Sequence, residues 1–212
     1  NTLSGGESAL DSPGIQQIDD MIHGTTNQQL RDIWGWMFAG VNRANYILEF
    51  QDKTDFSGKD NIIGQAKFLR AYYYFELVKW FGDVPLAVDE RLLFGDQFDV
   101  DRTPKAQVYA QIEADLIAAA AALPATQSVV GQATSGAAQS LLGKVYLYQD
   151  KFEDAATVLE LVVNGPYSLV TDYASIFEHA GENGSGSVFE VQYSDVEGAG
   201  FECLQCSEGN VA

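Results

Sequence analysis

The chain has 212 residues, 46% of them hydrophobic, which is enough to bury one ordinary core or two small ones and excludes a disordered protein. Its 30 acidic and 12 basic residues give a formal net charge of −18. That charge argues against nucleic acid as a partner, because phosphate binding needs clustered Lys and Arg, and against direct adhesion to an anionic membrane surface.

Residues 1–26 are rich in Gly, Ser, Asp and Thr and contain a turn signal at Pro13-Gly14. We predict a loop region with at most one short helix. No apolar run in the chain is as long as a membrane-spanning helix, and the first ten residues lack the charged and apolar regions of a signal peptide. We therefore expect no transmembrane segment and no export signal within these residues.

The first clear helical period lies in residues 27–50, where Asn27 is suited to cap a helix. Ser57-Gly58 then interrupts the chain. Seven residues form the apolar stripe of this predicted helix: Leu30, Ile33, Trp34, Met37, Val41, Ala44 and Leu48.

The segment 61–85, NIIGQAKFLRAYYYFELVKWFGDVP, is the one around which we expect the rest of the chain to pack. As a helix it is apolar nearly all round, so it should be a central helix covered on two sides. Gly82 and Pro85 are suited to end it. One predicted face carries Ile62, Ala66, Leu69, Tyr73, Leu77 and Trp80, and the opposite one carries Ala71, Tyr74, Phe75, Val78 and Phe81.

The run AKFLRAYYYF (66–75), followed by WFGDVPL (80–86), resembles the signature helix and turn of the SusD/RagB family. The resemblance extends in register over about 27–193. It includes the spacing of a Trp before an Ala-Asn pair in the family's first helix: Trp34, Asn42, Ala44 and Asn45.

This resemblance implies a lipoprotein of the outer membrane that faces the exterior of the cell. Such a protein binds oligosaccharide or another nutrient and delivers it to a SusC-like TonB-dependent transporter. The resemblance also implies a signal peptide and a lipid-bearing cysteine upstream of Asn1, and a further C-terminal part beyond residue 212.

Residues 83–102 include six acidic residues and are predicted to form a long, packed surface loop. Thr103 is predicted to cap the next helix, with Pro104 at its first position and Pro124 at its end. A polar linker, about 125–134, follows.

Residues 139–166 follow the tetratricopeptide pattern of paired helices. In that pattern Gly143 and Ala155 lie where the two helices approach most closely. One repeat cannot bury its own face, so we expect it to stack on the central helix and the helix at 104–123, with the helix at 27–50 closing the stack. The residues that match the pattern are Gln139, Leu142, Gly143, Tyr146, Ala155, Leu159 and Pro166.

The predicted fold class is therefore all-α, a tetratricopeptide-like α-α superhelix with a little irregular β-structure near the C-terminus. Residues 167–173 and 187–193 are the segments predicted to be extended. We divide the chain into an N-terminal loop region (1–26), a helical core (27–165), and a region that starts at 166–212 and is completed by residues outside this chain.

Reactive chemistry has little support in the sequence. His23 and His179 lie apart, in loops, without the spacing of a zinc or catalytic site. Asp96, Asp99 and Asp101 are a weak calcium candidate, and solvated acids are the stronger interpretation because their spacing departs from known calcium loops. We therefore predict a protein that is not an enzyme and needs no cofactor.

Two cysteines, Cys203 and Cys206, form a C-x-x-C pair near the end of the chain. A redox motif, half of a metal site and a disulfide are all compatible with this spacing. A local structural disulfide is the leading interpretation for an exported protein.

Exposed rings beside short polar side chains are what a sugar site requires, because sugar C–H faces rest on aromatic rings while their hydroxyls form hydrogen bonds. Trp36 lies off the stripe of its helix and close in sequence to polar residues. The candidate glycan-binding residues are His23, Asn27, Trp36, Phe94 and Phe98. Two other functions stay open: a tetratricopeptide module that binds a partner protein, and an all-α glycoside hydrolase with two carboxylates across a cleft.

Overall fold

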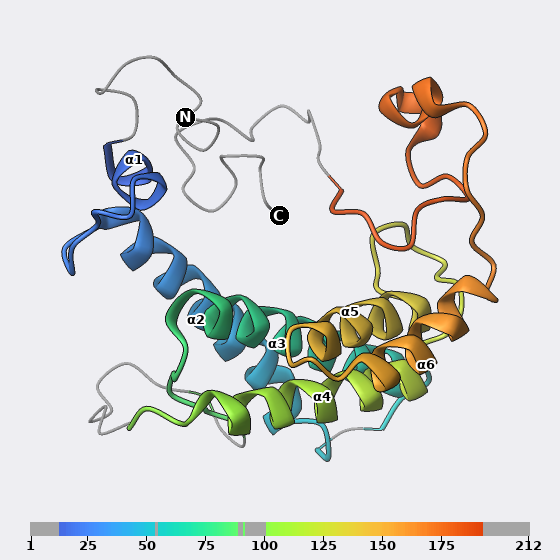
Figure 1. Cartoon of the computed structure of the whole chain (residues 1–212). Coiled ribbons are helices and arrows are strands. Elements are labelled where there is room, and N and C mark those ends of the chain that lie inside the picture. The colour runs from blue at the N-terminus through green and yellow to red at the C-terminus, as the bar shows by residue number, and fades with distance from the viewer. Residues whose placement is uncertain (1–12, 54, 89–90, 92–100, 193–212) are drawn as a thin grey trace, which may run out of the picture.

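The structure is a computed structural model that describes residues 13–53, 55–88, 91 and 101–192 (Figure 1). These residues form six α-helices and two short 3-10 helices, which agrees with the predicted all-α class. The α-helices are α1 (Pro13–Asp19), α2 (Gln28–Glu49), α3 (Lys59–Phe81), α4 (Lys105–Ala122), α5 (Ser135–Leu147) and α6 (Phe152–Val163). The 3-10 helices are η1 (Tyr173–Phe177) and η2 (His179–Gly181).

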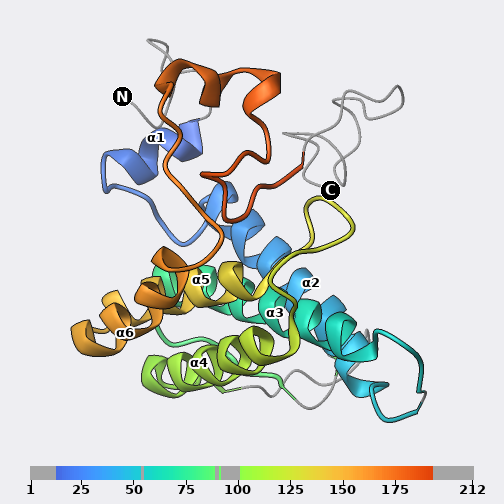
Figure 2. The ribbon, with the colours of Figure 1, turned by 90° about the vertical axis from the view of Figure 1, so that its right-hand side faces the viewer.

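The helices α2 to α6 pack in chain order, each against the next, and form one helical layer (Figures 1 and 2). The helix α3 lies between α2 and α4, as expected of a helix that is apolar on both sides. The helix α1 and residues 166–192 rise on the same side of this layer, at its two ends (Figure 1).

The predicted strands are wrong for the part of the chain that the structure describes. Residues 167–173 and 187–192 contain no strand, and the only β-bridge among the described residues joins Val84 to Thr103. An extended segment becomes a strand only when a neighbour pairs with it along its length. Here the first segment forms one backbone hydrogen bond, from Ser168 N to Ser185 O (2.8 Å), with the residues that precede the second segment.

The core lies where α3 meets α4 and α5, and Tyr74, Phe75 and Leu77 are its fully buried members on α3. The predicted burial of the opposite stripe is wrong in part. Ile62 and Leu69 are exposed, and so is Trp80, with 45% of its surface accessible. Ala66 and Leu77 of the same stripe are buried, so the neighbours of α3 cover this stripe only in part.

The start of α4 also differs from the prediction. The helix begins at Lys105, and no side chain of Thr103 or Pro104 caps it. Instead, Asp83 accepts a hydrogen bond from the Lys105 backbone N–H through its Oδ1 (2.8 Å), although it lies 22 residues earlier in the chain. A carboxylate at this end of a helix is favourable because the helix dipole is positive there.

The helix pair α5 and α6 has the close approach that the pattern of small residues predicted. A Cβ atom on Gly143 would lie 2.5 Å from Leu159 Cδ2, so a larger residue there would need Leu159 to move. Ala155 is buried. Thr134 caps α5 by accepting a hydrogen bond from Ala137 N, and Asp150, with φ of 58°, turns the chain toward α6.

Candidate functional site

The residues that the sequence suggested for glycan binding are only partly described. His23 is exposed, and Trp36 is exposed over 52% of its surface on α2. Phe94 and Phe98 lie outside the described residues. Their role in binding stays a prediction.

Asn27 is buried, and its amide is used within the fold. Its Oδ1 caps α2 by accepting a hydrogen bond from Leu30 N (3.1 Å), as predicted. Its Nδ2 donates to Gly14 O (2.8 Å) and Gln17 Oε1 (3.2 Å) on α1. Asn27 therefore joins α1 to α2, and its place in the predicted glycan site remains untested.

The predicted calcium and cysteine groups fall mainly outside the described part of the chain. Asp101 is exposed, whereas Asp96, Asp99, Cys203 and Cys206 are not described. The described ranges hold no cluster of three or more His, Cys, Asp or Glu side chains that could bind a metal ion. His179 lies on the surface beside Glu182, with 2.8 Å between its Nδ1 and the Glu182 Oε1.

A buried polar core network joins α2, α3 and α4 to the chain that follows α3. We define it as Asn45, Arg70, Tyr74 and Asp115, all of them buried. Arg70 is 5% exposed and Asp115 is 3% exposed, and they form a bidentate pair in which Nε and Nη2 each lie 2.7 Å from a carboxylate oxygen. Removing either partner of such a buried pair would leave the other charge uncompensated, which is strongly destabilising.

The same network holds the chain at Ala87 and Val88. Arg70 Nη1 donates to Asn45 Oδ1 (2.9 Å) and to Val88 O (2.7 Å). Tyr74 OH accepts from Ala87 N (2.7 Å) and donates to Ala87 O (2.9 Å). Burial raises the pKa of the Tyr74 hydroxyl to about 12.

A further contact holds the next described residue of this loop. Arg91 Nε donates to Glu49 Oε2 at 2.7 Å, and its guanidinium lies 4.4 Å from the centre of the Tyr46 ring. The hydrogen bond from Arg91 lowers the pKa of the Glu49 carboxyl. The loop after α3 is therefore tied to α2 and α3 up to this point.

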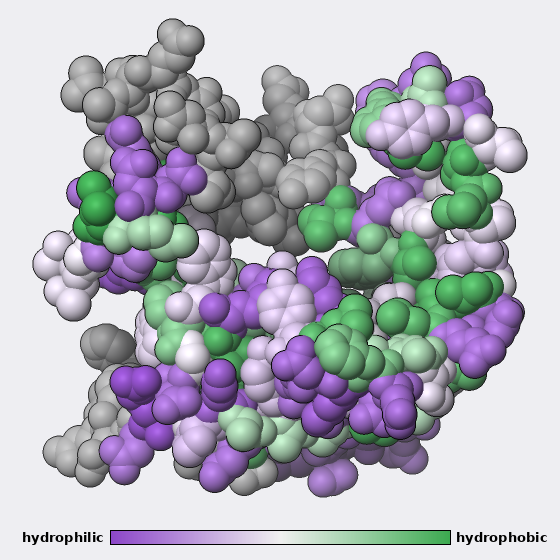
Figure 3. Space-filling model, in the orientation of Figure 1, coloured by the Kyte–Doolittle hydropathy of each residue, from purple (hydrophilic) through white to green (hydrophobic). Residues whose placement is uncertain are grey.

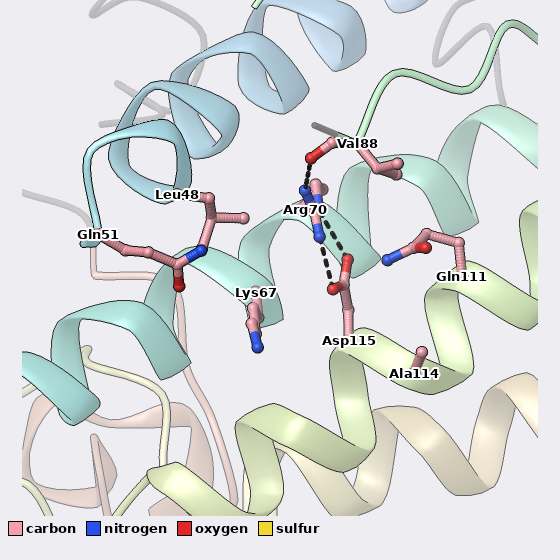
Figure 4. Close-up of a pocket in the computed structure, with 8 residues that line it drawn as sticks. All are labelled: Leu48, Gln51, Lys67, Arg70, Val88, Gln111, Ala114 and Asp115. Carbon is pink, nitrogen blue, oxygen red and sulfur yellow. Dashed lines mark hydrogen bonds and ion pairs between the residues drawn. The ribbon is translucent and has the colours of Figure 1, made fainter. Parts of the chain in front are cut away.

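A cavity of about 360 Å³ lies next to the polar core network (Figure 4). Arg70 and Asp115 form its inner wall and bond to each other. Gln51, Lys67 and Gln111 stand on its other sides. Among the described residues, no aromatic ring lines this cavity, so they do not provide the flat apolar surface on which a sugar would rest.

A second cavity, which we call the linker hollow, lies between residues 125–134 and residues 183–190 and has a volume of about 290 Å³. The two segments lie side by side in both ribbon views (Figures 1 and 2). Tyr167 and Phe189 are the two aromatic residues in its lining. Among the described residues of its lining, Glu190 is the one with a charged side chain.

Amide side chains attach the linker to α3. Gln65 Nε2 donates to Ala133 O (2.7 Å) and its Oε1 accepts from Ala133 N (2.9 Å). Gln127 Nε2 donates to Ala133 O (2.7 Å) and to Asn61 Oδ1 (2.9 Å). This side of the hollow is therefore anchored to the helical layer.

The opposite side of the hollow is held by its own hydrogen bonds. The amides of Asn183 and Gln192 bond to each other twice, at 3.0 Å each. The Asn183 backbone N–H donates to Glu190 Oε2 (3.0 Å). Gly131, at the tip of the linker, has φ of +85° and approaches Gln192 so closely that a Cβ atom would lie 2.7 Å from its Cγ.

Both rings of the hollow are fixed by contacts with the helices. Phe189 packs edge-on against the buried Phe68, with 5.3 Å between ring centroids, yet remains 41% exposed. The Tyr167 hydroxyl lies 3.1 Å from Thr134 Oγ1 and directly over Gly136, where a Cβ atom would overlap it. This hollow was not predicted, because residues 125–134 were expected to form a polar linker and residues 187–193 an extended segment, with no pattern that brings the two together. The amide and hydroxyl side chains of the two segments were the only signal in the sequence.

Exposed hydrophobic side chains are concentrated at one end of the helical layer. On the face seen in Figure 3, hydrophobic side chains gather over the α6 end and the segment that follows it. Leu161, Val163 and Leu169 are exposed there. No helix in the described residues is long and apolar enough to span a membrane.

Helices packed in chain order, with cavities beside their connecting segments, form a helical scaffold for binding. Residues 8–147 match the model of the SusD-like family, which is described as starch-binding and associating with the outer membrane. The match covers more than half of the chain, and the chain therefore belongs to the SusD-like family. This family is one of binding proteins, which confirms the prediction that the chain is not an enzyme.

Individual relatives agree with this assignment. A SusD-like protein P2 of Formosa agariphila is 29% identical over 170 residues, which are 77% of this chain and 34% of that protein. A solved laminarin-binding SusD-like protein is 34% identical, with a TM-score of 0.81 over 89% of this chain and 43% of that one. A SusD superfamily protein of Bacteroides vulgatus is 28% identical, with a TM-score of 0.80 over 86% of this chain and 40% of that one. The chain thus spans about a third of the length of its curated relatives.

Proposed function

We propose that the protein to which this chain belongs captures oligosaccharide at the cell surface and delivers it to a SusC-like TonB-dependent transporter. The observation that carries the proposal is the likeness to the laminarin-binding SusD-like protein, which extends over 89% of this chain at 34% identity. Binding is the whole of the proposed activity, and no bond of the ligand is made or broken.

The proposal assigns different tasks to the parts of the chain. The consecutive packing of α2 to α6 supports a tetratricopeptide-like superhelix over 27–165, which would serve as the scaffold beside the transporter. The regions 1–26 and 166–212 flank it. A lipid anchor upstream of Asn1 would hold the protein on the outer face of the membrane.

Trp36 is the described residue that we propose as a sugar platform. Its ring is 52% exposed on α2, and an exposed indole can stack against the C–H face of a sugar. His23, Asn27, Phe94 and Phe98 complete the proposed group. Of these, the exposed His23 is free to present its ring to a ligand, whereas Asn27 would act by fixing the start of α2.

Affinity electrophoresis and calorimetry of the full-length protein test the proposal. Laminarin, starch and other neutral polysaccharides should retard the protein without releasing any product. Trp36→Ala should weaken binding about fivefold, since stacking on a ring contributes about 1 kcal/mol. Phe56→Ala is a matched control, because Phe56 is 51% exposed and lies beyond the other end of α2. If no polysaccharide binds, the proposed function is wrong.

A further inference from the structure

We propose that the linker hollow is a second sugar-binding subsite, which takes a short stretch of an uncharged oligosaccharide. The inference rests on the proposed function and adds to it a place and a ligand class. It concerns the cavity between 125–134 and 183–190, whose described lining residues include none from α2, the helix that carries Trp36.

The first argument is the pair of fixed rings. Phe189 is held by Phe68 at 5.3 Å, and Tyr167 is held by Thr134 at 3.1 Å, yet both line the open hollow. A ring that is already ordered loses little conformational freedom when a sugar stacks on it. The cavity at the polar core network has no such ring.

The second argument is unused hydrogen-bonding capacity. Thr126, Gln132 and Ser187 line the hollow, and their side chains form no hydrogen bond within the described part of the chain. A ligand rich in hydroxyls offers donors and acceptors to such groups at once. Selective sites gain most of their discrimination from polar groups that a wrong ligand would leave unpaired.

The third argument is charge. Glu190 is the single charged residue that the described part of the chain contributes to the lining, and its Oε2 already accepts a hydrogen bond from Asn183 N. The chain as a whole carries a formal charge of −18. Both facts disfavour an anionic polysaccharide and favour a neutral one. The volume of about 290 Å³ is small for a ligand pocket, so the subsite can hold only a few sugar residues of an oligosaccharide.

Two sets of substitutions in the full-length protein test the subsite. Phe189→Ala removes a stacking surface, and Gln132→Ala combined with Ser187→Ala removes two hydrogen-bonding groups without touching the ring. Each should weaken binding of laminarin about three- to tenfold, measured by calorimetry. Matched controls are Phe177→Ala, on an exposed ring of η1, and Ser128→Ala, on a linker residue outside the hollow.

The outcomes separate the subsite from the general function. Loss of affinity in both hollow variants, with unchanged controls and unchanged unfolding midpoints, supports the subsite. Wild-type affinity in the double polar variant overturns the subsite and leaves the proposed function standing. Failure of the unaltered protein to bind any neutral polysaccharide overturns both, and preferential binding of alginate, an anionic polysaccharide, overturns the ligand class.

Discussion

The polar core network and the linker hollow use similar side chains in opposite ways. In the network, the Arg70 guanidinium, the Asp115 carboxylate and the Tyr74 hydroxyl are all buried and bonded to partners in the chain. In the hollow, Gln132 and Ser187 have no bonded partner in the described ranges. Polar groups that already have hydrogen-bond partners within the chain make the fold rigid, whereas polar groups without such partners are available to bind a ligand.

The difference also separates what the two regions can tolerate. A buried pair that loses one member leaves an uncompensated charge, so substitutions in the network should lower the free energy of unfolding and leave the affinity for ligand unchanged. Substitutions in the hollow should lower the affinity for ligand and leave the free energy of unfolding unchanged.

Removing one partner of the buried pair should have the largest effect. Arg70→Ala leaves Asp115 buried without its counter-charge and should lower the free energy of unfolding by about 3–5 kcal/mol. Urea denaturation followed by circular dichroism measures it. The control Arg31→Ala, at a side chain 73% exposed, should cost less than about 0.5 kcal/mol. Equal losses in the two variants would contradict the assignment.

Alkaline pH should weaken the network through Tyr74. Its folded-state pKa is about 12, above the ordinary value of 10, so the unfolded chain loses this proton first. Stability is therefore full below pH 10 and falls as the pH rises toward 12, by about 2 kcal/mol from this group. Unfolding free energies measured from pH 8 to 11.5 should show this slope reduced in Tyr74→Phe.

That variant has its own effect at neutral pH, where it removes the hydrogen bonds between Tyr74 and Ala87. We expect a loss of about 1 kcal/mol at pH 7, which provides the baseline for the pH series. A slope as steep in Tyr74→Phe as in the unaltered protein would show that another group causes the alkaline loss.

The tip of the linker should depend on a glycine. Gly131→Ala places a Cβ atom at φ of +85° and against Gln192, and should cost about 1–2 kcal/mol or displace residues 183–192. Hydrogen exchange at Asn183, together with laminarin affinity, reports the displacement. Gly24→Ala meets no atom within 4 Å and serves as the control. Unchanged protection and affinity in Gly131→Ala would show that the hollow does not need this turn.

Salt should have the smallest effect. A neutral ligand in a site with one charged lining residue gains little from long-range electrostatics, so its affinity should change less than about twofold between 50 and 500 mM NaCl. Isothermal titration at several salt concentrations tests this. A steep loss of affinity with salt would indicate an ionic ligand and would remove the contrast in charge between the two regions.

Sequence reasoning succeeded where a signal is local or strongly periodic. The stripe of α2, its cap at Asn27 and the small residues Gly143 and Ala155 were all recognisable, because helix period, caps and close helix approach depend on neighbours one or two turns away. The motif 66–86 identified the family for the same reason: it is a continuous run.

Errors arose where the deciding partner lies far along the chain. Helix α4 is capped by Asp83 and not by Thr103, and Trp80 is exposed although it belongs to the stripe of α3 that was predicted to be buried. The segments predicted to be extended, 167–173 and 187–193, form no strand pairing within the described residues. None of these outcomes follows from the residues next to them in sequence.

The sequence by itself determined the helices, their order and the family, since these depend on spacing and on short motifs. Only the tertiary structure decided that Arg70 is buried in a saturated network, and that residues 125–134 meet residues 183–190 around open polar groups. Whether a side chain is buried, and which distant segments meet, depends on how the helices pack. Residues about 50 positions apart share no sequence period from which their contact could be predicted.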